Sequence, residues 1–238
     1  QKNVLCYAAL EDIMVSNGKQ LIIDDTPFLE ISASHMTLNQ RIIKRLMDLA
    51  ISGLGLLLLS PLLGVISLCI YLEDGGPVIF RQQRVTLRGR IFTIYKFRTM
   101  HCNTRNVATD ELTESVNCIT KSGRFLRKTS LDELPQLFNI LSGSMSFVGP
   151  RPLIPEEKEI RTLRREYGVY SVRPGMTGLA QVNGRDKLSI EEKALFDKEY
   201  VDKQSLWLDI KIMFKTVKVV LCREGISEGG EKGNTRRP

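Results

Sequence analysis

An uninterrupted apolar run from Leu49 to Leu72 dominates the pattern of hydrophobic and polar positions along the chain. Its 24 residues carry no charge. As a straight helix the run would span about 36 Å, enough to cross a hydrocarbon core of about 30 Å. Ser60-Pro61 lies at its midpoint, and proline kinks or breaks the interior of a helix. Each half would then be about 18 Å long, enough to enter one leaflet and return.

The charges beside this run favour the re-entrant arrangement. Basic residues precede it (Arg41, Lys44 and Arg45) and also follow it (Arg81, Arg84, Arg88 and Arg90). An excess of Lys and Arg marks cytoplasmic segments, and here both flanks have that character. The pattern alone leaves two structures open: a spanning helix with a tolerated proline, and a helix-break-helix hairpin whose ends lie on one side.

Shorter patterns predict the other elements. Segments 21–23 and 28–31 are expected to form strands, and 78–80 and 91–95 a β-hairpin around Leu87–Arg90. Helical periodicity predicts helices at 123–141, 155–167, 189–203 and 205–222. The segment 102–120 reads as a polar surface loop, and the Gly- and charge-rich tail 223–238 as disordered.

Composition narrows the class of partner. The 238 residues carry a formal net charge of +7, which favours a polyanionic partner. Beside a membrane segment, anionic lipid or a phosphorylated substrate is favoured over nucleic acid. The five cysteines show no CxxC pair, so reduced thiols in a cytoplasmic setting are expected. No cleavable signal peptide is recognised.

A basic segment follows the apolar run. Between Phe80 and Met100 there are six basic residues and no acidic one. For Arg88 and Arg90, the arginines of the turn, attraction to anionic headgroups, about 1 kcal/mol per charge, is a sufficient explanation. Lys96 and Arg98, which flank Phe97 on the predicted strand, are candidates for a phosphate site.

The segment Ser130–Pro135 has two interpretations. Ser130 and Glu133 have the spacing of a helix-capping box, a purely structural role. Alternatively, Asp132 and Glu133 at a helix start, with cations around them, can hold Mg²⁺ and a pyrophosphate together. The cations are Lys121, Arg124, Arg127 and Lys128. An aspartate carboxylate can also attack phosphorus and form an acyl phosphate.

Further arginines lie in rigid or glycine-rich loops. Arg151 stands between Pro150 and Pro152, which would fix its planar guanidinium for bidentate contact with phosphate oxygens. Arg173 and Arg185 belong to glycine-rich stretches that resemble binding loops, a weaker signal.

The helix predicted at 205–222 is amphipathic, with apolar residues on one face (Leu206, Ile210, Phe214, Val217 and Leu221) and lysines on another (Lys211, Lys215 and Lys218). Such a stripe can pack on a protein core. It can equally lie in a membrane interface, with its lysines toward the headgroups and Trp207 at the boundary.

Taken together, these segments resemble the monotopic phosphoglycosyl transferases, bacterial sugar transferases that begin exopolysaccharide and glycan assembly. The match covers about residues 41–222. It rests on Lys44–Asp48, Ser60-Pro61, Gly76–Gln82, Tyr95–Met100, Ser130–Gln136, Gly149–Pro152 and Arg173–Gly175.

The resemblance implies a fold and a reaction. The fold is a mostly helical α/β protein, with a re-entrant helix broken at Ser60-Pro61, a β-hairpin and interfacial amphipathic helices. Asp132 would attack the β-phosphate of a UDP-sugar, UMP would leave, and undecaprenyl phosphate would then take the phosphosugar. Glu133 completes the dyad, with Mg²⁺ as the cofactor. Phosphate-binding candidates are Lys96, Arg98, Arg127, Arg151, Arg173 and Arg185.

The expected organisation has four parts: an N-terminal extension at 1–40 that resembles the end of an upstream domain, the membrane hairpin at 41–74, a cytoplasmic catalytic domain at 75–222, and the tail. The expected location is the inner membrane of a bacterium, with the catalytic domain on the cytoplasmic face. Homo-oligomerisation is left open. The rival hypothesis is a non-catalytic membrane scaffold that binds anionic lipid and assembly partners.

Overall fold

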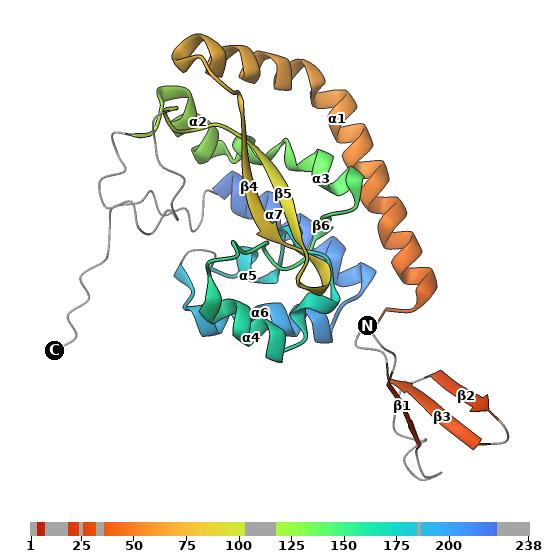
Figure 1. Cartoon of the computed structure of the whole chain (residues 1–238). Helices are drawn as coiled ribbons and strands as arrows, with labels where there is room; N and C mark the ends of the chain where they lie inside the picture. Colours follow the sequence, from red (N-terminus) through yellow and green to blue (C-terminus); the bar gives the residue numbers. More distant parts are fainter. Residues whose placement is uncertain are drawn as a thin grey trace.

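The computed structural model is a mostly helical α/β fold with one long apolar helix near its N-terminus (Figure 1). It describes residues 4–7, 19–23, 26–31, 36–102, 118–184 and 187–222. The disorder predicted for 223–238, and most of the loop predicted at 102–120, lie outside these residues. Within them the strands form three small sheets.

The first sheet is formed by β1 (Val4–Tyr7), β2 (Lys19–Ile23) and β3 (Thr26–Ile31). Its order is β1-β3-β2 with antiparallel pairing throughout. The strands predicted at 21–23 and 28–31 are therefore confirmed. Figure 1 shows this sheet beside the N-terminal end of the chain, apart from the main body.

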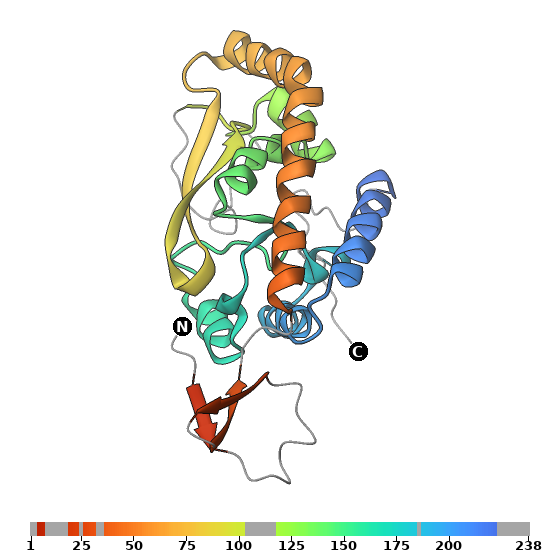
Figure 2. The same ribbon diagram turned by 90° about the vertical axis from the view of Figure 1, so that its right-hand side faces the viewer.

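Helix α1 (Leu38–Asp74) contains the whole apolar run and begins at a capping box between Thr37 and Gln40. Pro61 lies inside this helix, so the predicted helix-break-helix is corrected to one helix that is bent rather than interrupted (Figures 1 and 2). Proline cannot donate to the carbonyl four residues earlier, which is that of Leu57. The Ser60 hydroxyl donates to that carbonyl instead, at 2.8 Å. Ser60 thus supplies the hydrogen bond that Pro61 cannot make.

Both ends of α1 contact the same folded body. Near its start, Lys44 donates to Asp209 and to the Val148 carbonyl, and the Phe147 amide donates to Asp48. At its end, the carboxylate of Glu73 accepts from two backbone amides at the N-terminus of α2 (Lys121–Thr129), with distances of 2.6 and 2.9 Å. The two ends therefore lie against one folded body, and the bend lies between them.

The middle of α1 is far less enclosed. By length and composition α1 is the one helix in the described residues able to cross a membrane, and only 11% of its most apolar window is buried. A core helix of a soluble protein would be mostly buried. Leu57 and Leu58, next to the bend, are 70% and 75% exposed.

The predicted hairpin is confirmed as β4 (Ile79–Val85) and β5 (Ile91–Phe97), joined through a short 3₁₀ turn at Leu87–Gly89. Its register pairs Phe80 with Lys96 and Arg84 with Phe92. Since side chains alternate across a strand, Arg84, Ile94 and Lys96 share one face of the hairpin.

The single helix predicted at 123–141 is wrong. Helix α2 ends at Thr129, a 3₁₀ turn follows at Leu131–Glu133, and α3 spans Gln136–Ser142. Ser130 separates α2 from the turn with a left-handed backbone, φ 56°. That conformation is unfavourable for a residue other than glycine and cannot continue a helix.

The remaining elements form the rest of the body. The parallel strands β6 (Ser146–Val148) and β7 (Gly175–Thr177) pair with each other. Around them lie α4 (Lys158–Glu166), a turn at Val169–Ser171, α5 (Leu179–Val182), α6 (Ile190–Asp202) and α7 (Leu206–Cys222). The helices predicted at 155–167, 189–203 and 205–222 are confirmed. Val148, Tyr200 and Ile212 form the centre of the core here.

Candidate active site

The Asp132-Glu133 pair lies on the short turn that links α2 and α3. The capping-box interpretation of this segment is wrong, because the Ser130 side chain makes no cap hydrogen bond and its backbone is left-handed. Glu133 does not bend back toward Ser130 either, since its carboxylate faces the hairpin. A strained, non-glycine backbone beside two acidic residues is typical of a functional site.

Glu133 is paired with cations from two other elements. Its Oε1 lies 2.7 Å from the Lys96 ammonium on β5 and 3.6 Å from a guanidinium nitrogen of Arg151. Lys96 and Glu133 are largely shielded, with side chains 17% and 11% exposed. Burial lowers the pKa of Lys96, and the charge of Glu133 opposes this shift.

Asp132 has different surroundings from its neighbour. Burial, reinforced by the charge of Glu133, raises the pKa of Asp132, while Lys96 and Arg127 oppose the rise. Arg127 lies on the Asp132 side of the pair, held by a 2.9 Å hydrogen bond from its Nε to Thr99. Among the described residues Asp132 makes no ion pair, so its carboxylate is available to an incoming group.

The loop that carries Arg151 is fixed by a close crossing of two backbones. A Cβ added to Gly175 would lie 2.1 Å from the amide nitrogen of Gly149, so neither segment tolerates a side chain at the crossing. Arg164 donates to the carbonyl of Arg151 at 2.7 Å, and Arg84 donates to the carbonyl of Pro152 at 3.1 Å. The backbone around Arg151 is therefore held on both sides.

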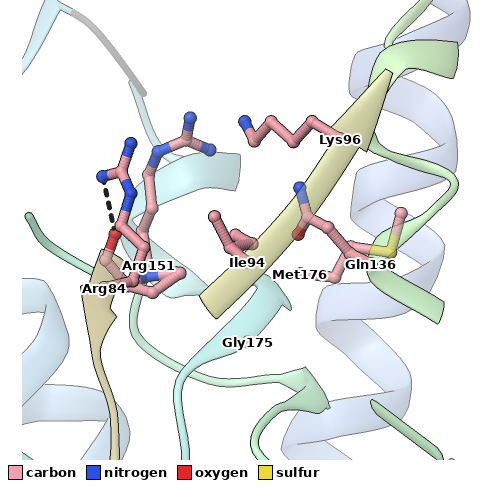
Figure 3. Close-up of a pocket in the computed structure, with 8 residues that line it drawn as sticks. Arg84, Ile94, Lys96, Gln136, Arg151, Gly175 and Met176 are labelled. Carbon is pink, nitrogen blue, oxygen red and sulfur yellow. Dashed lines mark hydrogen bonds between the residues drawn. The ribbon is translucent and has the colours of Figure 1, made fainter. Parts of the chain in front are cut away.

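A pocket opens between this loop and the hairpin, on the Glu133 side of the dyad. Figure 3 shows the charged ends of Arg84, Lys96 and Arg151 pointing into one space, above Ile94 and Met176. Gln136, at the start of α3, also lines the pocket. Cations thus face the dyad from two sides, with Arg127 beside Asp132 and the pocket beside Glu133.

Three predicted phosphate ligands are not in this cluster. Arg98 lies just beyond the end of β5 and binds Asp74 and the Gly75 carbonyl, so it anchors the end of α1. Arg173 donates to the carbonyl of Gly143. Arg185 lies outside the described residues. Conversely, Arg84 is not among the predicted phosphate ligands, and the register of the hairpin brings it into the pocket.

The donor chemistry of the dyad suits the predicted Mg²⁺. In the described residues no group of three or more His, Cys, Asp or Glu side chains is arranged to hold a metal. Mg²⁺ does not need such a group, because it commonly takes one or two carboxylates and completes its shell with substrate phosphates and water. The adjacent carboxylates of Asp132 and Glu133 fit that pattern.

Helix α7 exposes large apolar side chains as well as lysines to solvent. Its buried positions include Asp209 and Ile212, whereas Phe214 and Val217 are 74% and 57% exposed. Trp207 is exposed as well, with the Lys211 ammonium 5.3 Å from its ring centre. Of the predicted apolar stripe, Leu206 and Ile210 are half-buried, whereas Phe214 and Val217 are exposed. The exposed part of the stripe favours the interfacial interpretation.

Comparison with known proteins identifies relatives along most of the chain. A family model described as "Bacterial sugar transferase" matches residues 39–223. The chain is 44% identical over 223 residues to the UDP-glucose:undecaprenyl-phosphate glucose-1-phosphate transferase of Escherichia coli, covering 90% of this chain and 46% of that protein. It is 42% identical over 207 residues to the undecaprenyl-phosphate galactose phosphotransferase of Salmonella typhimurium, covering 79% and 42%.

The similarity to longer relatives is confined to part of their sequence: the chain spans about half the length of these two proteins. A shorter relative is the uncharacterized sugar transferase EpsL of Bacillus subtilis, 43% identical over 187 residues. That alignment covers 79% of this chain and 91% of EpsL.

Proposed function

The chain belongs to the bacterial sugar transferase family, and on that premise we propose that it transfers a sugar-1-phosphate from a UDP-sugar to undecaprenyl phosphate, as a first step of polysaccharide assembly. The observation that carries the proposal is the Asp132 carboxylate: it is shielded and without an ion pair among the described residues, and it lies between two sets of cations. The names of the two long relatives support the choice of acceptor.

The proposed reaction has two steps at one carboxylate. An oxygen of Asp132 attacks the β-phosphorus of the UDP-sugar, the bond to the bridging oxygen breaks, and UMP leaves with that oxygen. An oxygen of the lipid phosphate then attacks the same phosphorus and releases Asp132. Splitting one transfer into two steps in this way is nucleophilic catalysis.

In this proposal the cations around the dyad stabilise the negative charge of the phosphoryl group. In phosphoryl transfer a protein mainly positions its substrate and stabilises the charge on the phosphoryl oxygens. Arg127 faces that charge from the Asp132 side, and Lys96 and Arg151 from the other. Glu133 fixes Lys96 by their 2.7 Å contact. Asp132 and Glu133 would hold Mg²⁺, which neutralises phosphate charge when bound.

The same proposal places α1 in the membrane as a re-entrant helix. Its two ends are joined to one body through Lys44 and Glu73, so they cannot lie on opposite sides of a bilayer while those contacts exist. The bend between them exposes Leu57 and Leu58 to lipid. With basic residues on both flanks, the body lies on the cytoplasmic face of the inner membrane.

The test is release of UMP from a panel of UDP-sugars in the presence of Mg²⁺ and undecaprenyl phosphate. We expect at least one donor to yield UMP and a lipid-linked phosphosugar, and Asp132→Asn to yield neither. Asp202→Asn, at an exposed position on α6, is the matched control. Binding to anionic lipid with no turnover on any donor would instead favour the scaffold hypothesis.

A further inference from the structure

The pocket on the Glu133 side of the dyad brings three cationic side chains together. Arg84, Lys96 and Arg151 line it together, and Glu133 is the carboxylate that contacts Lys96 and Arg151. Arg84 makes no ion pair among the described residues. Glu133, Glu156 and Glu157 act on the Arg84 charge without forming an ion pair with it. Within the part of the chain that the structure describes, its guanidinium therefore has no carboxylate in direct contact and can pair with an anion from outside the chain.

The Arg84 side chain is held in the wall of the pocket by hydrogen bonds and is partly buried there. One of its terminal nitrogens donates to the carbonyl of Pro152 (the dashed line in Figure 3) and the other to Gln82, at 2.6 Å. Its Nε is buried and has no hydrogen-bond partner. Burial, with Arg151 close by, lowers the pKa of Arg84 to about 10, so it remains a cation at neutral pH.

The two-step reaction says which anion belongs there. In each step the attacking and leaving oxygens lie roughly in line with the phosphorus. Asp132 is the attacking group in the first step and the leaving group in the second. The phosphate of UMP therefore departs from the side opposite Asp132, and the phosphate of the lipid must enter on that same side. Both are phosphate monoesters, and one site has to accept them in turn.

Building on the proposed function, we propose that the pocket of Arg84, Lys96 and Arg151 is this shared phosphate-monoester site, occupied first by the leaving nucleotide phosphate and then by the acceptor phosphate. Arg84 is a substrate-binding residue in both half-reactions. In the first step the P–O bond to UMP breaks as the P–O bond to Asp132 forms. In the second the bond to Asp132 breaks as the bond to the lipid phosphate oxygen forms, which gives a pyrophosphate.

Binding of UMP alone tests the pocket without any chemistry. By calorimetry on the purified protein, Arg84→Gln is expected to raise the Kd for UMP at least 10-fold. Arg84→Lys, which keeps the charge but not the planar fork, should give an intermediate Kd. Arg90→Gln, an exposed arginine of the same hairpin, should leave the Kd unchanged. An unchanged Kd in a folded Arg84→Gln protein would overturn the proposal.

Discharge of the phosphosugar adduct then separates the two phosphates. Adduct formed on the wild type and on Arg84→Gln is mixed with UMP, which reverses the first step, or with undecaprenyl phosphate. One shared site predicts that Arg84→Gln slows both discharges by a similar factor, at least 10-fold. Slowing of only one would mean two separate sites and would refute sharing. If no adduct forms on the wild type, the proposed function fails, and UMP binding still tests the pocket on its own.

Discussion

The Lys96 ammonium lies 2.7 Å from Oε1 of Glu133, whereas the adjacent carboxylate of Asp132 makes no ion pair among the described residues. Two neighbouring acids in one turn thus have different surroundings. Glu133 is tied to the hairpin, and Asp132 carries the raised pKa of a shielded carboxylate. Environments that separate two acids in this way commonly assign them different roles.

We expect Asp132→Asn to abolish adduct formation and turnover while the protein stays folded. With UDP-sugar and Mg²⁺ but no lipid phosphate, the wild type should gain the mass of a phosphosugar, labile to hydroxylamine as an acyl phosphate is. Intact-mass spectrometry measures this directly. An active Asp132→Asn protein, or a wild type without the adduct, would refute the assignment of Asp132.

The stability of the same variant reports on the pKa of Asp132. Here the pKa of Asp132 is raised from its ordinary 3.8, so the folded state holds the proton more tightly than the unfolded chain does. The free energy of unfolding then falls as pH rises through the raised pKa, and Asp132→Asn should remove that fall. Urea denaturation at several pH values measures it.

The pH dependence of adduct formation should respond to the two neighbours in opposite directions. The nucleophile must be ionised, so the rate should rise with pH through the pKa of Asp132. Glu133→Gln removes a repelling charge and should move the midpoint to lower pH, even if the maximal rate falls. Arg127→Gln removes an attracting charge and should move it to higher pH. Midpoints that shift in the same direction would contradict the described electrostatics.

Much of this architecture follows from the sequence, because it depends on local patterns. The apolar run, the hairpin and the helices at 155–167, 189–203 and 205–222 each rest on a periodicity that the structure keeps. Local patterns also misled. Ser130 and Glu133 have the spacing of a capping box. The backbone of Ser130 is left-handed, however, and Glu133 pairs with Lys96, which is distant in sequence, so the segment does not cap a helix.

The composition of the cluster depended on geometry that the sequence does not contain. Lys96 and Arg98 are two residues apart and would share a face of a continuous strand, yet β5 ends at Phe97 and Arg98 turns to Asp74. Arg84 reaches the pocket because it shares a hairpin face with Ile94 and Lys96. The alternation of side chains along each strand is visible in the sequence. Which residues of the two strands share a face depends on the register, which the sequence does not give.

The topology of α1 can be tested with single cysteines in a cysteine-free background. Because both ends of α1 bind one body, cysteines at Asn39 and Arg90 should both resist a membrane-impermeant thiol reagent in intact cells. Both should react once the cells are permeabilised. Labelling of one of the two in intact cells would mean that α1 spans the membrane.

The position of α7 can be read from its tryptophan, since Trp207 is the only one in the chain. If the exposed face of Trp207 and Phe214 lies in the interface, lipids brominated near the top of their acyl chains should quench its fluorescence in proteoliposomes. Lys211→Glu with Lys218→Glu should weaken the quenching through repulsion from anionic headgroups. The matched control changes Lys198 and Lys203 to Glu. Equal quenching in both double variants would argue against an interfacial α7.

The buried pair of Arg164 and Asp197 should affect catalysis by positioning Arg151. These side chains are 4% and 1% exposed, and Arg164 also holds the Arg151 carbonyl at 2.7 Å. Asp197→Asn leaves Arg164 buried without its counterion, which should cost about 3 kcal/mol of unfolding free energy or more. Breaking the exposed Lys198–Asp202 pair should cost less than about 0.5 kcal/mol.

A double apolar replacement distinguishes positioning from stability. Arg164→Met with Asp197→Leu removes both charges, so the protein should regain most of the unfolding free energy that Asp197→Asn loses. The Arg151 carbonyl would still lack its donor, and a displacement of about 1 Å at a phosphate ligand can cost about 100-fold in rate. We therefore expect kcat/KM to stay depressed, mainly through the KM for the UDP-sugar, in a protein of near-normal stability. Recovery of kcat/KM together with stability would show that the pair serves the fold alone.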